Sequence, residues 1–248
     1  MSGHSKWANI KHRKGAQDAK RGKMFTRITK EIQIAVKESG SDPDTNPRLR
    51  LAVQNARSVN MPKDNVNRAI KKASESGGEN FEEVTYEGYG HGGVAVFVEC
   101  ATDNHNRTVS NIRHIFTKRG GSLGTNGSLS FIFERKGVVN VLNEGVDIDE
   151  IELELIDAGA DDFETEGDLI VITTALEDFS NVQKKLEELN VEVQSAGLQR
   201  VPNMYKKLDV DDAKKFLRMI DDFEDDDDVQ NVYHNLEMTD ELAKALEE

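Results

Sequence analysis

Apolar residues recur at helical spacing through the first quarter of the chain. Between residues 20 and 39 they repeat every three or four positions, and lysine and arginine fall on the opposite side of the helix. Asn46 before Pro47 predicts the capped start of a second helix. Pro62 predicts the start of a third helix, which the glycine pair 77–78 ends. Residues 20–76 are therefore expected to form a small three-helix bundle with a basic outer surface.

The hydrophobic period then changes from helical to alternating, which is the pattern of strands with one buried face. The alternating positions are Val94, Val96 and Val98 in one predicted strand and Leu129, Phe131 and Phe133 in another. Further strands are predicted at 138–142, near 163, at 169–173, at 191–193 and at 229–234, and helices at 106–118, 148–158, 179–189 and 213–223. The predicted fold class is α+β.

The order of these elements predicts how the chain is divided. Residues 136–200 read strand, helix, strand, strand, helix, strand, which is the βαββαβ order of the ferredoxin-like fold. Residues 77–135 and 201–248 are expected to join into a second, related unit. The expected organisation is a basic flexible arm at 1–19, a helical basic domain at 20–76 and two ferredoxin-like α+β domains, the last inserted into the middle one.

The net charge of -14 conceals two parts of opposite sign. Residues 1–75 contain 17 lysines and arginines against 7 aspartates and glutamates, whereas residues 76–248 contain 15 against 39. Such segregation is typical of a basic binding module joined to an acidic body. In free protein the two parts should attract each other, so that a polyanion has to compete with the acidic body for the basic module.

Cysteine content and hydropathy indicate a reducing, aqueous compartment. Cys100 is the only cysteine, which excludes an internal disulfide and a cysteine-based zinc site. No apolar run approaches the roughly 20 residues of a membrane span, and the first residues lack the apolar core of a secretory signal. Their basic, acid-poor character overlaps with that of an organelle transit peptide. A cytoplasmic protein with no membrane partner is expected.

The basic arm and the outer faces of the helices form the candidate nucleic-acid surface. Their cations attract phosphate through counterion release, and the only tryptophan, Trp7, is suited to stacking on an unpaired base. The alternative interpretation is a flexible solubilising tail, or a Trp7 packed on the bundle. The predicted contact residues are Lys6, Trp7, Lys11, Arg13, Lys14, Lys20, Arg21, Lys23, Arg27, Lys30, Lys63, Arg68 and Lys71.

Two polar loops in the acidic body are further candidates for phosphate contact. Residues 102–108 lead into a helix N-terminus, which attracts phosphate, and residues 120–128 link the end of that helix to a strand. Helix capping by aspartate or asparagine, and glycine at the helix end, explain both loops equally well without a ligand.

The other motifs do not predict catalysis, a cofactor or a metal site. Residues 88–93 match G-x-G-x-x-G but precede a strand instead of linking a strand to a helix, so a hairpin turn is favoured over a dinucleotide site. Cys100 and His105 are a candidate nucleophile and base, but a lone cysteine at a strand end is more often simply buried. The acidic run 221–228 lacks the ligand spacing of a calcium loop and is expected to be a solvated helix end. A non-enzymatic protein without a small-molecule substrate is expected.

Several long motifs, in the right order, resemble the YebC/PmpR family of bacterial proteins. They are residues 1–14 (MSGHSKWANIKHRK), 60–65, 102–108, 120–128 and 228–235, spread over nearly the whole chain. The resemblance implies a three-domain cytosolic protein with a helical N-terminal domain and two α+β domains. A eukaryotic relative of the family is a mitochondrial translational activator of cytochrome c oxidase.

Two functions follow from the resemblance. The family consists chiefly of DNA-binding transcriptional regulators, and a role as a ribosome-associated translation factor that eases difficult peptide-bond formation, as at proline runs, is also attributed to it. Composition and helix faces predict binding to a polyanion without separating DNA from ribosomal RNA. The expected function is a DNA-binding transcriptional regulator, with the translation factor as the alternative, and the oligomeric state stays open.

Overall fold

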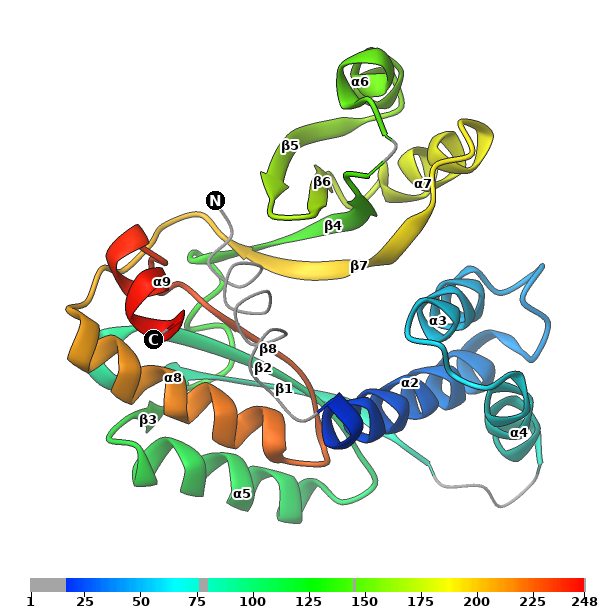
Figure 1. Cartoon of the computed structure of the whole chain (residues 1–248). Coiled ribbons are helices and arrows are strands. Elements are labelled where there is room, and N and C mark those ends of the chain that lie inside the picture. Colours follow the sequence, from blue (N-terminus) through cyan, green and yellow to red (C-terminus); the bar gives the residue numbers. More distant parts are fainter. Residues whose placement is uncertain (1–16, 76–79, 145, 248) are drawn as a thin grey trace.

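The computed structural model describes residues 17–75, 80–144 and 146–247 (Figure 1). In the described part the chain begins with three helices, which are α2 (Gln17–Ser39), α3 (Pro47–Ser58) and α4 (Lys63–Ser74). The side chain of Asn46 caps α3 by accepting a hydrogen bond from the Leu49 amide at 3.0 Å, as the sequence predicts. Burial of Ile32, Leu49 and Val66 between the helices gives the bundle an apolar core of its own.

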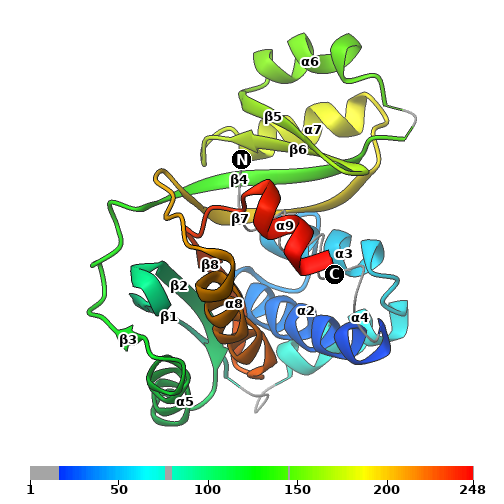
Figure 2. The same cartoon turned by 60° about the vertical axis from the view of Figure 1, so that its left-hand side comes forward.

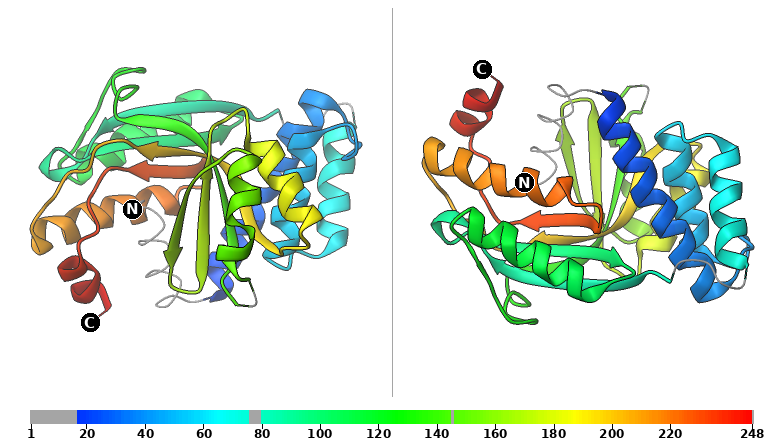
Figure 3. Two further views of the ribbon diagram at one scale, coloured as in Figure 1. Left: turned by 90° about the horizontal axis from the view of Figure 1, so that it is seen from above. Right: turned by 90° about the horizontal axis from the view of Figure 1, so that it is seen from below.

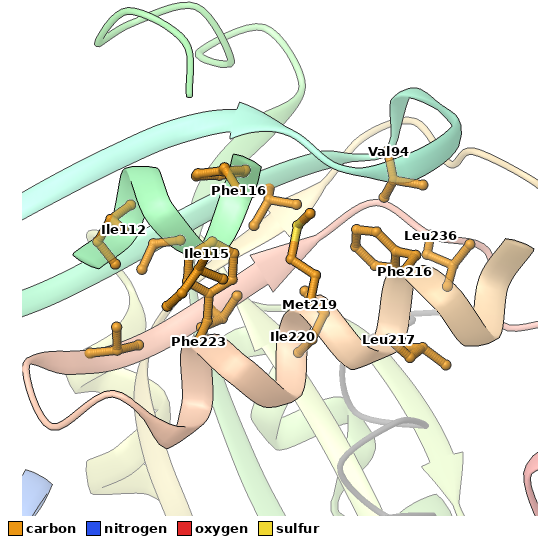
Figure 4. Packing of buried hydrophobic residues seen from close by; sticks show 14 of the residues in the cluster. Val94, Ile112, Ile115, Phe116, Phe216, Leu217, Met219, Ile220, Phe223 and Leu236 are labelled. Atoms are coloured by element: carbon orange, nitrogen blue, oxygen red, sulfur yellow. The ribbon is translucent and has the colours of Figure 1, made fainter. Parts of the chain in front are cut away.

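The first sheet takes its strands from two parts of the chain, which are separated by the segment that forms the second sheet. Its strands are β1 (Glu82–Tyr89), β2 (Ala95–Thr102), β3 (Ser122–Leu123) and β8 (Val229–His234), paired antiparallel in the order β3-β1-β2-β8. Helices α5 (His105–Lys118) and α8 (Val210–Asp225) pack on one face (Figure 4). The rings of Phe116 and Phe223 meet edge to face at 4.9 Å between the centroids, a favoured geometry for aromatic pairs.

The glycine-rich segment 88–93 forms the turn between β1 and β2. A short 3-10 helix (His91–Gly93) makes the reversal, in which Gly92 and Gly93 adopt positive φ angles of 69° and 76°. A Cβ atom at Gly88 would lie 2.5 Å from the Ser122 carbonyl oxygen of β3 and 2.7 Å from the Phe116 ring of α5. The G-x-G-x-x-G match is thus a hairpin with close helix packing, as expected from its sequence context.

The second sheet is formed by the segment between β3 and α8. Its elements, in chain order, are β4 (Phe133–Leu142), α6 (Ile148–Asp157), β5 (Ala160–Glu166), β6 (Leu169–Thr174), α7 (Phe179–Glu188) and β7 (Val193–Pro202). The strand order β5-β6-β4-β7, antiparallel throughout, is that of the ferredoxin-like fold. The first sheet shares its layering but not its order, because β1 and β2 are consecutive and central.

The two sheets are joined where the chain leaves and re-enters the first (Figure 2). β4 carries the chain into the second sheet, its neighbour β7 carries it back, and β8 then pairs with β2. The fold class is therefore confirmed as α+β with an N-terminal helical bundle and one unit inserted within the other. A last helix, α9 (Asp240–Glu247), follows β8. Within the described ranges, no helix has the length and apolar character needed to cross a membrane.

One predicted strand face is wrong. Residues 129–132 form turns, in which the Ile132 amide donates to the Leu129 carbonyl at 2.9 Å, and β4 begins only at Phe133. The turn buries Leu129 and Ile132 and leaves Phe131 61% exposed. The strand prediction from the alternating pattern is wrong here, because consecutive residues of a turn do not point to opposite faces of a sheet.

Candidate nucleic-acid interface

The structure separates the predicted contact residues into three groups. Lys6, Trp7, Lys11, Arg13 and Lys14 lie outside the described residues. A second group belongs to α2 and consists of Lys20, Arg21, Lys23, Arg27 and Lys30. A third group belongs to α4 and consists of Lys63, Arg68 and Lys71. Lys20 lies on the first turns of α2.

The cations of α2 face the acidic body. Figure 3 shows α2, in blue, beside the C-terminal end of α8, with α3 and α4 on the far side of α2. Lys23 forms an ion pair with Asp225. The Arg27 guanidinium donates to the backbone carbonyl of Glu224 at 2.9 Å and to that of Val229 at 3.1 Å. Burial lowers the pKa of Arg27 despite the opposing charges of Glu224 and Asp225.

Lys30 is buried at the junction of α2 with the first sheet. Its ammonium donates to the carbonyls of Ala101 and Asp227, at 2.9 and 2.8 Å, and to the Asp228 carboxylate at 3.2 Å. Only 8% of the residue is exposed. A buried ammonium must be matched by such partners, because its desolvation is otherwise costly.

Asp228 is the centre of this buried polar network. Besides Lys30, its carboxylate accepts hydrogen bonds from the Arg107 guanidinium and from the Thr108 hydroxyl, each at 2.8 Å. Burial alone would raise the pKa of Asp228, but the hydrogen bonds from Arg107 and Thr108 and the charge of Lys30 outweigh it, and the pKa lies below its ordinary value. A cleft of about 600 Å³, lined in part by Phe81 and Asn111, opens beside the network.

These contacts correct two expectations from the sequence. Arg27 and Lys30 do not lie on a solvent face of the bundle but hold it against the acidic body. The acidic run 221–228 is not simply a solvated helix end, because Asp228 is buried and Asp222 accepts two hydrogen bonds from Arg119 at 2.8 Å. The sequence feature that could have predicted this contact is the presence of both a helical stripe of cations and a dense acidic run.

The exposed cations of the bundle lie mainly on α3 and α4. Lys63, Arg68 and Lys71 of the predicted surface are exposed on α4. Lys71 pairs with Glu75 at 3.8 Å, but both side chains are well exposed, so the pair contributes little. Exposed cations of the described helices that were not predicted as contacts are Lys37 on α2, Arg50 and Arg57 on α3, and Lys72 on α4.

Arg21 lies at the exposed start of α2. Its guanidinium stands 5.7 Å from the centroid of the Phe25 ring and donates to the Asn60 carbonyl at 3.4 Å. Its charge therefore lies close to the turn between α3 and α4.

The first of the two candidate loops caps a helix and serves the buried network. The Asn104 side chain caps α5 by accepting from the Arg107 amide at 3.1 Å. Thr102 is buried, and its hydroxyl oxygen accepts a hydrogen bond from the Asn104 amide at 2.9 Å and lies 2.7 Å from the Thr108 hydroxyl oxygen. The capping interpretation is confirmed for this loop, and the role of Arg107 as a partner of Asp228 is an addition that sequence reasoning missed.

The second loop is held by a buried glutamate that the sequence did not single out. The Glu87 carboxylate accepts hydrogen bonds from the Gly127 amide at 2.7 Å and the Leu129 amide at 2.6 Å. Glu87 is only 4% exposed. Its position in a strand explains why no local pattern could indicate a partner 40 residues later.

Cys100 does not have the environment of a nucleophile. It is 2% exposed, and burial, followed by the charges of Asp226 and Asp228, raises the pKa of its thiol far above the ordinary value. Because the thiolate is the reactive form, such a thiol is inert at neutral pH. The preferred interpretation of a buried strand cysteine is confirmed.

These observations define a class of protein. A basic helical bundle is docked through cations on an acidic α+β body, and the body consists of two sheets, one inserted within the other. Residues 5–76 match the domain family described as the TACO1/YebC protein N-terminal domain, and residues 81–236 match the TACO1/YebC second and third domain. The chain belongs to the TACO1/YebC family.

Known relatives extend over the whole chain. A probable transcriptional regulatory protein of Treponema denticola is 54% identical over 239 residues, covering 96% of this chain and 97% of the relative. One from Proteus mirabilis is 51% identical over 250 residues, covering 100% and 99%. The crystal structure of a conserved hypothetical protein from Aquifex aeolicus superposes with a TM-score of 0.85 at 43% identity, covering 93% of this chain and 96% of that one.

Proposed function

We propose that this chain is a nucleic-acid-binding regulator of gene expression, and specifically a DNA-binding transcriptional regulator of the YebC type. The observation that carries the proposal is the exposed cationic side of α4, formed by Lys63, Arg68, Lys71 and Lys72 on a bundle with its own apolar core. Relatives of about 50% identity over their full length bear the name of probable transcriptional regulatory proteins. The proposed function is that of a soluble, cytoplasmic protein without enzymatic activity.

The proposed surface contacts phosphate and not base edges. Lysine ammonium groups on an exposed helix neutralise phosphates and release counterions, which gives affinity without sequence preference. The basic arm at residues 1–19 is proposed to extend the same surface. Arg27 and Lys30 are left out of it, because the acidic body occupies them.

The alternative is a translation factor that acts on the ribosome and relieves stalling at difficult sequences. The lysine-rich composition of the exposed side of α4 supports it equally, because ribosomal RNA presents the same phosphate chemistry and duplex RNA is bound largely by shape. Crosslinking of the protein in cell extract, followed by sequencing of the recovered nucleic acid, separates the two. Promoter DNA is expected for the transcriptional regulator and ribosomal RNA for the translation factor.

A titration of purified full-length protein tests the surface itself. The variant Lys63→Met with Arg68→Met should bind duplex DNA at least tenfold more weakly at moderate salt, irrespective of sequence, and the slope of log affinity against log salt should fall by about 2. Lys184→Met with Arg113→Met, at exposed positions of α7 and α5, is the matched control, because it removes one lysine and one arginine outside the bundle. Equal affinities for the double variant and the control would reject the α4 surface.

A further inference from the structure

The loop between α5 and β4 has a fixed backbone. The Glu87 carboxylate holds the Gly127 and Leu129 amides, and the Glu87 carbonyl accepts from the Gly124 amide at 2.7 Å. Burial of a carboxylate is unfavourable unless hydrogen bonds match it, and here the loop supplies them. The loop conformation is therefore determined by a buried group and not by its exposed residues.

This loop presents a large aromatic ring to solvent. Phe131 is 61% exposed, whereas Leu129, Ile132 and Phe133 beside it are buried against the second face of the first sheet. The ring does not contribute to that core. Exposed aromatic residues on a preorganised loop are typical of binding surfaces.

A second segment is fastened to the loop and adds cations. Asn203 donates its backbone amide to the Ile132 carbonyl and its side-chain amide to the Phe131 carbonyl, each at 2.9 Å. Met204 and Tyr205, which follow, are 49% and 39% exposed. Lys206 and Lys207 come next and are also exposed.

The second segment is itself held in place by Asn235. The Asn235 side-chain amide donates to the Met204 carbonyl at 3.2 Å, and the backbone carbonyl of Asn235 accepts from the Lys206 amide at 2.7 Å. The segment therefore stays beside Phe131. Aromatic and basic residues thus follow one another on the second segment, which is fastened at Asn203 to the loop that carries Phe131.

The local charge distinguishes these segments from the rest of the body. Residues 129–135 and 203–207 contain three cations, Arg135, Lys206 and Lys207, and one acid, Glu134. The body as a whole has 39 acids and 15 cations. An exposed aromatic ring next to lysines is the combination by which proteins hold single-stranded nucleic acid, because bases stack on the ring and cations follow the phosphates.

We propose that Phe131, Tyr205, Lys206 and Lys207 form a second nucleic-acid contact, the aromatic–basic surface, which binds unpaired bases of a single strand. This inference rests on the proposed function and deepens it. Phosphate contact through α4 is indifferent to base pairing, whereas the aromatic–basic surface requires bases that are free to stack. Single-stranded DNA and RNA present the same chemistry here.

Fluorescence anisotropy with full-length protein tests the surface. The probes are labelled 12-nucleotide oligothymidylate and oligouridylate, and a 12-base-pair DNA duplex. Phe131→Leu should raise the dissociation constant for the single strands about tenfold, since a stacking contact is lost, and leave duplex binding unchanged. Phe131→Tyr should bind single strands like wild type. Leu153→Ala, at a 74% exposed apolar position of α6, is the control.

The outcomes keep the two proposals apart. A wild-type protein that binds none of the three probes overturns the proposed function and this inference together. Wild-type binding that Phe131→Leu leaves intact on both single strands overturns only the aromatic–basic surface. An effect on oligouridylate alone, or on oligothymidylate alone, supports the surface and identifies its strand as RNA or DNA.

Discussion

Replacement of Lys30 by methionine is the sharpest test of how the bundle is held. Methionine keeps much of the apolar stem but removes the ammonium that bonds to Ala101, Asp227 and Asp228. The ammonium also lies 4.9 Å from the centroid of the Phe81 ring. The variant thus loses contacts only between α2 and the acidic body.

The expected loss of stability follows from the burial of the pair. The side chains of Lys30 and Asp228 are 10% and 6% exposed. Removal of one partner from a buried ion pair costs about 3–5 kcal/mol, because the other charge stays buried. The lower end, about 3 kcal/mol, is expected here because Arg107 still neutralises Asp228. With a urea m value of about 3 kcal/mol/M, the unfolding midpoint should fall by roughly 1 M.

Urea denaturation at pH 7, followed by circular dichroism, measures this shift. Lys63→Met is the matched control, since it makes the same chemical change at an exposed position and should alter stability by no more than about 0.5 kcal/mol. Nucleic-acid affinity should show the reverse, with a loss for Lys63→Met and none for Lys30→Met while the protein is folded. Equal midpoints for the two variants would refute the assigned role of Lys30.

Three further predictions concern pH and the opposed charges. Because the folded pKa of Asp228 is lowered, its stabilisation is full above the unfolded value of about 3.9 and is lost as pH falls through the folded value. The difference in urea midpoint between wild type and Lys30→Met should therefore shrink below about pH 4. Deletion of residues 1–16 should leave the urea midpoint unchanged and weaken nucleic-acid binding about tenfold or more, whereas unchanged affinity would remove the arm from the surface. In fragment 1–76, Lys23 and Arg27 are released from the acidic body, so the fragment should bind DNA more tightly than the full chain at low salt. The difference in affinity should narrow once the Debye length falls to about 8 Å. Weaker binding of the fragment at every salt concentration would contradict the competition between the acidic body and DNA.

The order of the elements could be predicted because it depends on neighbouring residues. Asn46 and Pro47 start α3, and the inserted βαββαβ unit follows from alternating and helical periods. The strand predicted over Leu129, Phe131 and Phe133 failed because a turn can carry the same alternation as a strand. That failure concealed the exposed ring of Phe131.

The sequence by itself determined the fold class, the nesting of one α+β unit in another, and the separation of positive from negative charge. Only the tertiary structure decided which cations are available to a ligand. Lys30 and Lys63 look alike in the sequence, yet one is buried on Asp228 and the other is exposed on α4. The physical reason is that desolvation and ion pairing depend on groups about 200 residues apart, which meet only when α2 packs against the end of α8.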